Sequence, residues 1–250
     1  KKKGMLNMKK VLIAILACSA LLVGTTACGT TNNTTSSTNS TTETTSSVVS
    51  QVTNPDYQKP ENISTADDAK KALEAGNKAY KDGNIDITAT NADRTDLSEN
   101  GQKPYAVVIT CSDSRVPPEL IFNSGLGELF TIRTAGNVVA DFETGSVEYG
   151  VDHLGAPLVV VMGHTKCGAV AGAIEGHAEG HVEDIIHDIL PSVEQARQNA
   201  KGEDEIATLA ETYNVQNSIN QLRESEILSK AEPDRKSTRL NSSHLRIAYS

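Results

Sequence analysis

Two short apolar runs constrain the fold of this chain more than any other feature. Residues 105–111 read YAVVITC, and residues 157–164 read PLVVVMGH. Both runs are rich in β-branched residues and short, so each predicts a strand that is buried on both faces. Stretches with helical spacing of apolar residues separate and follow the two runs. This alternation predicts an α/β fold in which a mainly parallel β-sheet is flanked by helices.

The remaining expected elements follow from helix caps, prolines and glycines. A second strand is expected over residues 128–137. Helices are predicted over residues 64–84, 117–123, 144–155, 166–176, 182–200, 203–225 and 225–234. We expect Pro191 to interrupt the helix over 182–200, because proline lacks the backbone N–H that a helix interior needs. No internal repeat is visible.

The N-terminus has the pattern of an export signal. Lys9 and Lys10 precede an apolar stretch, residues 11–24, that is too short for a comfortable membrane span. Small residues then lead to Cys28, so residues 1–28 resemble a bacterial lipoprotein signal in which Cys28 is lipidated. A plain cleaved secretion signal is the alternative, and Cys18 is a weaker candidate for lipidation.

Residues 29–60 are predicted to be a disordered linker, since they are dominated by Thr, Ser and Asn as far as residue 53. A flexible tether of about 25 residues has a root-mean-square reach of roughly 25–30 Å. We therefore expect an exported, membrane-anchored lipoprotein, or a secreted protein if Cys28 carries no lipid.

The folded domain is expected to span residues 61–235. Residues 236–250, KSTRLNSSHLRIAYS, show no periodic pattern and resemble translated adapter sequence. They are expected to be a non-native tail, with the last strand of the domain missing. The net charge of −9 and the absence of Trp argue against a nucleic-acid partner.

The candidate site lies at the ends of the two apolar runs. Cys111 ends the first run, and His164 ends the second with Cys167 three residues later. Carboxyl ends of neighbouring parallel strands meet at one edge of a sheet, so these three side chains are expected to lie together. Cysteine and histidine are zinc ligands, and three protein ligands leave a fourth position open, as catalytic sites do. A disulfide between the two cysteines is the alternative in an exported protein.

The sequence around these residues resembles the β-class carbonic anhydrases. The resemblance rests on CSDSRVPPELIFNSGLGELFTIRTAGN and on GSVEYGVDHLGAPLVVVMGHTKCGAV. It implies one Zn²⁺ held by Cys111, His164 and Cys167, with Asp113 and Arg115 as a catalytic pair. In some members the equivalent aspartate moves onto the metal, so Asp113 is a candidate fourth ligand in a closed state. The resemblance also implies a homodimer or tetramer.

The implied activity is the reversible hydration of CO₂ to bicarbonate and a proton by zinc-bound hydroxide. Asp113 is expected to accept a hydrogen bond from that hydroxide, and Arg115 to hold Asp113 and keep it ionised. Two alternatives stay open: a carbonyl sulfide or carbon disulfide hydrolase on the same fold, and a non-catalytic zinc-binding lipoprotein. The substrate-binding residues are not predicted.

Two further expectations concern residues near this site. Gly168 is expected to let the backbone approach the metal ligands closely. The remaining histidines of the domain are expected to be solvated and not to act as ligands; they are His153, His177, His181 and His187.

Overall fold

The computed structural model of the chain describes residues 63–85, 91–231 and 240–241. The chain divides into two units, Lys1–Val48 and Val49–Ser250, and all described residues belong to the second. The predicted signal, Cys28 and the linker lie outside the described residues.

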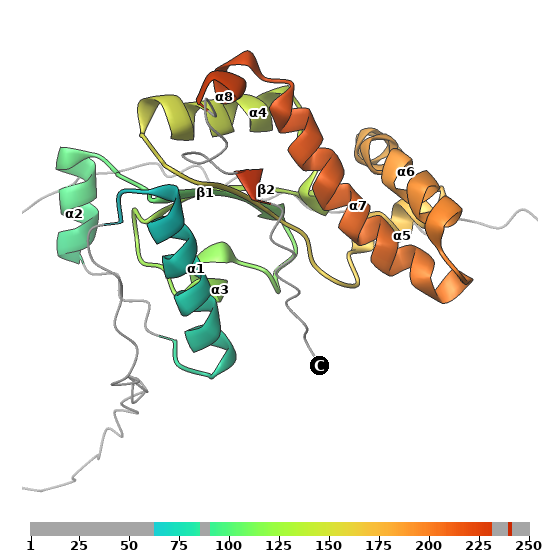
Figure 1. The fold of residues 1–250 in the computed structure, drawn as a ribbon, viewed down its shortest axis with the longest axis horizontal. Coiled ribbons are helices and arrows are strands. Elements are labelled where there is room, and N and C mark those ends of the chain that lie inside the picture. The colour runs from blue at the N-terminus through green and yellow to red at the C-terminus, as the bar shows by residue number, and fades with distance from the viewer. Residues whose placement is uncertain (1–62, 86–90, 232–239, 242–250) are drawn as a thin grey trace, which may run out of the picture. The chain divides into compact units, whose positions relative to one another are not determined.

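A parallel sheet forms the centre of the described unit (Figure 1). Its strands, in the spatial order β2-β1-β3-β4, are β2 (Leu129–Thr134), β1 (Ala106–Cys111), β3 (Val159–Met162) and β4 (Leu240–Asn241). Every pairing is parallel. The predicted α/β class and parallel sheet are confirmed.

Both faces of the sheet are covered, as the uninterrupted apolar runs require. All six residues of β1 are buried. Ala106 and Val108 pack into one hydrophobic cluster, whereas Val107 and Ile109 pack into a second. Figure 1 shows α1 and α3 on one side of the sheet and α4 and α8 on the other.

The helices fall close to the predicted ranges. They are α1 (Ala66–Lys81), α2 (Asn91–Asn100), α3 (Pro118–Ile121), α4 (Asp141–Glu148), α5 (Gly168–Glu175), α6 (Val182–Asn199), α7 (Glu203–Arg223) and α8 (Glu226–Ala231). A 3₁₀ turn, η1 (Ala135–Asn137), follows β2, and a π-helical turn, η2 (Tyr149–His153), continues α4. Thr65 caps α1 by accepting a hydrogen bond of 3.2 Å from the backbone N–H of Asp68.

The prediction that Pro191 interrupts its helix is wrong. The helix α6 runs without a break from Val182 to Asn199 and contains Pro191. Pro191 is exposed, while Ile189 and Val193 on either side of it are fully buried. Burial of this apolar face compensates for the one backbone hydrogen bond that proline cannot make.

Helix α2 was not predicted, because its sequence NADRTDLSEN has no apolar periodicity. Its described side chains are exposed, except for the half-buried Leu97. Nothing in the local pattern separates this helix from a polar loop.

The C-terminal segment contributes more to the sheet than expected. Leu240 and Asn241 pair in parallel with Val159 and Val160 of β3. These two residues belong to the segment 236–250 that the sequence excluded from the fold, and they take the outer place beside β3. The domain boundaries stay a prediction.

Within the described residues, no helix combines the length and the apolarity that crossing a membrane requires.

The strand order places a topological switch point at the centre of the sheet. The chain leaves β1 to form β2 on one side and returns to form β3 on the other. In open parallel sheets, ligands bind outside the carboxyl ends of strands at such a point. Here these ends are Cys111 on β1 and the turn that follows Met162 on β3.

Candidate metal centre

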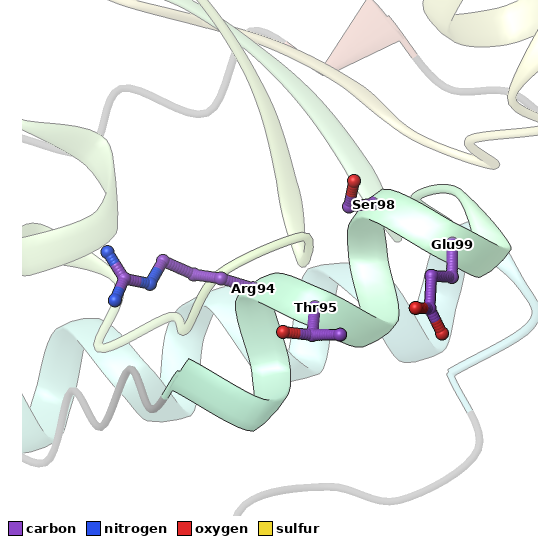
Figure 2. Close-up of a pocket in the computed structure, with 4 residues that line it drawn as sticks. All are labelled: Arg94, Thr95, Ser98 and Glu99. Atoms are coloured by element: carbon purple, nitrogen blue, oxygen red, sulfur yellow. The ribbon is translucent and has the colours of Figure 1, made fainter. Parts of the chain in front are cut away.

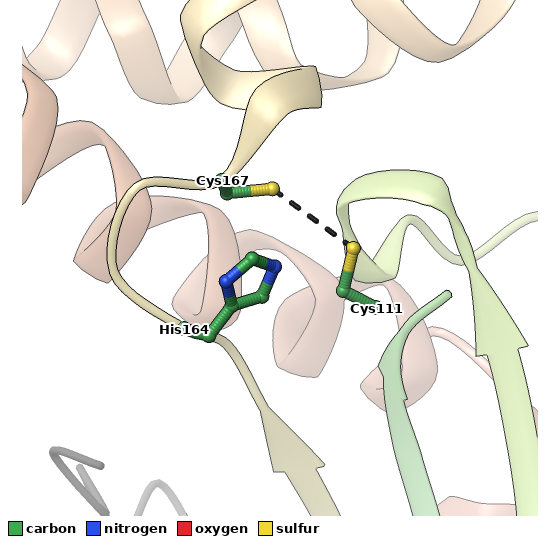
Figure 3. A group of neighbouring side chains, drawn as sticks. All are labelled: Cys111, His164 and Cys167. Carbon is green, nitrogen blue, oxygen red and sulfur yellow. Dashed lines mark hydrogen bonds between the residues drawn. The ribbon is translucent and has the colours of Figure 1, made fainter. Parts of the chain in front are cut away.

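The three predicted ligands meet at the switch point (Figure 3). Cys111 ends β1, and His164 and Cys167 lie in the turn between β3 and α5. One ligand atom from each residue lies within 4.8 Å of the other two, and all three residues are buried. Among the described residues, this is the one group of His, Cys, Asp or Glu side chains arranged so that it could hold a metal ion.

The two thiols are not joined by a covalent bond. Cys111 and Cys167 are both free, and their Sγ atoms lie 4.0 Å apart. A disulfide needs about 2.05 Å between the sulfurs. The structure therefore contradicts the disulfide alternative and keeps both sulfurs available as ligands.

His164 is oriented as a metal ligand. Its Nδ1 lies 3.0 Å from the carbonyl oxygen of Thr165, which can only accept a hydrogen bond. The NH2 group of Arg115, which can only donate, lies 3.4 Å from the same Nδ1. Because the contact with Thr165 is the shorter of the two, we place the ring proton on Nδ1, which leaves a lone pair on Nε2. The Nε2 atom is buried and has no hydrogen-bond partner. An unpartnered buried nitrogen beside two thiols fits a Zn²⁺ site, since zinc prefers nitrogen and sulfur donors.

The two thiols are hydrogen-bonded to each other, and this contact shifts their pKa values in opposite directions. A hydrogen bond from Cys167 lowers the pKa of Cys111 to about 4, although burial opposes this shift. The same hydrogen bond, together with burial, raises the pKa of Cys167. The backbone N–H of Gly136 also donates to the Sγ of Cys111 over 3.3 Å. One thiolate is thus already stabilised, as metal binding requires.

Asp113 and Arg115 form a two-pronged ion pair at the edge of this group. The Nε and NH2 groups of Arg115 donate to the two carboxylate oxygens of Asp113 over 2.9 and 2.8 Å. The backbone N–H of Arg115 adds a third hydrogen bond of 2.9 Å. These bonds hold the pKa of Asp113 well below its usual range. The Oδ2 atom of Asp113 lies 4.0 Å from Nε2 of His164, so an ionised carboxylate faces the ligands.

Two arginines hold the turn that follows β1. The NH2 group of Arg115 donates to the carbonyl oxygen of Lys166 over 3.1 Å and so joins this turn to the one after β3. Arg133 on β2 donates to the carbonyl oxygens of Cys111 and Asp113 over 3.1 and 2.6 Å. The sequence predicted the pairing of Arg115 with Asp113 but not these backbone contacts.

Helix α7 supplies a contact that the sequence analysis missed. The carboxylate of Glu211 accepts a hydrogen bond of 3.0 Å from the backbone N–H of Cys167. Burial raises the pKa of Glu211, and the backbone hydrogen bonds oppose that shift. No local pattern distinguishes Glu211 from the other acidic residues of α7, because the contact spans 44 positions of the chain.

The expectation for Gly168 is wrong. A Cβ added at Gly168 would meet no heavy atom within 4 Å, so the backbone makes no close approach there. The close approach occurs at Gly163, before His164, where a Cβ would lie 2.6 Å from Cγ2 of Val215. The solvated histidines are confirmed: those described as exposed are His153, His177, His181 and His187.

A separate hollow lies on helix α2 and contains no ligand residue (Figure 2). It is lined by Arg94, Thr95, Ser98 and Glu99, all from this one helix. The switch point, not this hollow, gathers the groups that can carry out chemistry.

Comparison with known proteins identifies the family of this chain. The sequence profile of the carbonic anhydrase family matches residues 106–247, more than half of the chain. The chain belongs to the carbonic anhydrase family. Its relatives among solved structures assign the β class.

One curated relative and two solved structures show how far the similarity reaches. Carbonic anhydrase 2 of Mycobacterium tuberculosis is 46% identical over 102 residues, which cover 41% of this chain and 49% of that protein. The chain therefore spans about half the length of this curated relative. The β-carbonic anhydrase CafA of Aspergillus fumigatus superposes with a TM-score of 0.52 at 28% identity, over 68% of this chain and 80% of that chain. One of two tetrameric β-carbonic anhydrases of Sordaria macrospora gives 0.50 at 26% identity, over 67% and 84%.

Proposed function

We propose that this β-carbonic anhydrase catalyses the reversible hydration of CO₂ to bicarbonate and a proton. The observation that carries the proposal is the buried Cys111, His164 and Cys167 group, with its unpartnered Nε2, beside an ionised carboxylate. Binding a metal needs the first three residues alone. A reaction at that metal would also need the adjoining pair of Asp113 and Arg115.

The metal that suits these donors is Zn²⁺, held by Cys111, His164 and Cys167. When bound, it would supply Lewis acidity that makes water a usable nucleophile near neutral pH. The protein contributes a fixed His164 tautomer through Thr165 and a stabilised Cys111 thiolate through Gly136.

Asp113 is placed to orient the reacting water. Arg115 occupies one side of the carboxylate, and the Oδ2 atom still has a lone pair that can accept a hydrogen bond. Because its pKa is held low, Asp113 stays an acceptor at neutral pH and does not donate a proton. Accepting a hydrogen bond from the water would aim the lone pair of the water oxygen at the carbon of CO₂. The proton that bicarbonate formation releases passes to solvent.

The alternatives receive less support. The curated relatives are named carbonic anhydrases, which does not favour a carbonyl sulfide or carbon disulfide hydrolase. A zinc-binding lipoprotein without activity would not need the paired Asp113 and Arg115. Asp113 as a fourth ligand remains part of the proposal for a closed state, although here it is paired with Arg115.

We further propose that the protein is an oligomer at the cell surface. Support for a homodimer or tetramer comes from the tetrameric β-carbonic anhydrases of Sordaria macrospora. Support for export comes from the signal-like residues 1–28, and support for anchoring from the small residues before Cys28. A lipid on Cys28 would tether the domain through residues 29–60.

The function is tested by measuring CO₂ hydration and zinc content together on the purified chain, with Cys111→Ser for comparison. The expected result is about one zinc per subunit with turnover in the native chain, and loss of both in the variant. Stoichiometric zinc without turnover would instead identify a binding protein. Turnover that persists in Cys111→Ser would remove this site from the reaction.

A further inference from the structure

Helix α7 directs a stripe of polar side chains at the two turns that carry the thiols. Glu211, Asn214 and Ser218 are spaced by three and four residues, so they lie on one face of the helix. Asn214 and Ser218 are each 1% exposed. Buried polar side chains are costly unless they are hydrogen-bonded, and each of these three bonds to the backbone of a turn at the site.

Glu211 acts on the turn of Cys167. Its carboxylate accepts a hydrogen bond of 3.0 Å from the backbone N–H of Cys167, and the backbone N–H of Lys166 also lowers the pKa of Glu211. Lys166 has a φ of 56°, a left-handed conformation that residues other than glycine rarely adopt. Successive amides in such a turn form a concavity that attracts a negative group. The carboxylate of Glu211 accepts a hydrogen bond from this turn and so holds the turn that aims Cys167.

Asn214 acts on the turn of Cys111. Its Nδ2 donates to the carbonyl oxygen of Gly136 over 2.6 Å, and the N–H of Gly136 donates to the Sγ of Cys111 over 3.3 Å. Gly136 and its neighbour Asn137 have φ values of 68° and 48°. Ser218 donates to the carbonyl oxygen of Asn137 over 2.8 Å. This second left-handed turn is thus also held by α7.

We propose that Glu211 and Asn214 are positioning residues for the metal site, through which α7 sets the relative placement of the two thiols. The inference rests on the proposed function, because it assumes that the thiols bind zinc. Neither Glu211 nor Asn214 is proposed to bind the zinc directly. Each acts through a backbone group: the N–H of Cys167 for Glu211, and the peptide of Gly136 for Asn214.

The test is the zinc affinity of Glu211 variants, measured by competition with a chromogenic chelator. Glu211→Gln keeps an oxygen that can accept from Cys167, so its affinity should stay near that of the native chain. Glu211→Ala removes the acceptor, and Glu211→Asp withdraws it by one methylene group. Both should weaken zinc binding by about tenfold or more, since outer-sphere partners commonly contribute 10–100-fold. Glu194→Ala, at an exposed position of α6, is the matched control.

A variant of Asn214 provides an independent second test of the positioning role. Asn214→Asp keeps the size of the side chain but replaces the donor to Gly136 with an acceptor. It should weaken zinc binding by about as much as Glu211→Ala, through the other thiol. Thermal unfolding of each metal-free variant shows whether it folds. If Glu211→Ala does not fold, the comparison of Glu211→Gln with Glu211→Asp decides.

The outcomes separate this inference from the proposed function, because chelator competition needs no CO₂ turnover. Native affinity in Glu211→Ala or Glu211→Asp would overturn the positioning role while leaving the zinc site intact. Equal losses in Glu211→Gln and Glu211→Ala would overturn it in favour of a role for charge. If the native chain binds no zinc, the proposed function and this inference both fail.

Discussion

At the scale of single residues, we expect different side chains to bind the metal and to take part in the reaction. Cys111, His164 and Cys167 form the group that could hold a metal ion, whereas Asp113 and Arg115 lie outside that group. The 4.0 Å between Oδ2 of Asp113 and Nε2 of His164 brings the carboxylate to the ligands without making it part of the group. Substitutions at Asp113 should therefore affect turnover and spare metal content.

Asp113→Asn tests this separation. The amide is nearly the same size, but it cannot carry the negative charge that pairs with Arg115 and orients the water. We expect kcat/KM for CO₂ hydration to fall by about 100-fold or more, a loss typical of a missing proton-handling group. Zinc content should be unchanged. A variant with native kcat/KM would show that Asp113 takes no part in the reaction.

The pKa of Asp113 should depend on Arg115. The hydrogen bonds from Arg115 lower this pKa, so they stabilise the folded state at pH values above the ordinary aspartate pKa. That stabilisation is lost as the pH falls from about 4, the ordinary aspartate pKa, through the lowered pKa of Asp113 in the folded state. In Arg115→Ala, the pKa of Asp113 should rise toward its ordinary value, because the side-chain hydrogen bonds are lost while the backbone N–H of residue 115 still donates; an NMR titration of the carboxyl carbon would show this. An unchanged titration would mean that another group holds the carboxylate ionised.

At the scale of elements, the sequence predicted which three residues meet at the switch point better than it predicted the parts that hold them. The strands at 105–111 and 157–164, and the residues that end them, were predictable because apolar runs and strand-end geometry are local features. Glu211 was not predictable, because its role depends on where α7 packs. Pro191 was misjudged since tertiary burial of Ile189 and Val193 outweighs the local cost.

The packing of the turn after β3 against α7 should require a glycine at position 163. A Cβ there would lie 2.6 Å from Cγ2 of Val215, so Gly163→Ala forces one element to shift. We expect the free energy of unfolding to fall by about 1–3 kcal/mol, the usual cost of overpacking a core. Gly168→Ala is the matched control and should leave stability unchanged or slightly raised, because nothing lies within 4 Å. Denaturant unfolding of both variants would check this, and equal stabilities would contradict it.

At the scale of the whole molecule, exposed aromatic side chains bear on the proposed oligomer. Phe142 on α4 is 88% exposed, and Tyr149 at the start of η2 is 47% exposed. Tyr149 packs beside the ring of Phe130 with 5.9 Å between ring centroids. Larger exposed apolar patches mark surfaces that contact another chain, and we expect Phe142 to lie in the contact between subunits.

Phe142→Ser should therefore shift the protein toward smaller species in sedimentation velocity at equal concentration. The loss of a central aromatic contact commonly weakens an interface by more than about 1 kcal/mol. Val182→Ser, at the exposed start of α6, is the control and should leave the distribution unchanged. If the distribution of sedimentation coefficients is unaltered in Phe142→Ser, then Phe142 does not lie in the contact between subunits.

The most direct test of the whole account is X-ray absorption at the zinc edge of the purified, reduced protein. The account predicts two sulfur ligands at about 2.3 Å and one imidazole nitrogen at about 2.0–2.1 Å, with an oxygen completing four-coordination. Cys167→Ser should lose one of the sulfurs or the metal itself. A zinc ion bound only by nitrogen and oxygen, or a protein that retains no zinc, would contradict the account.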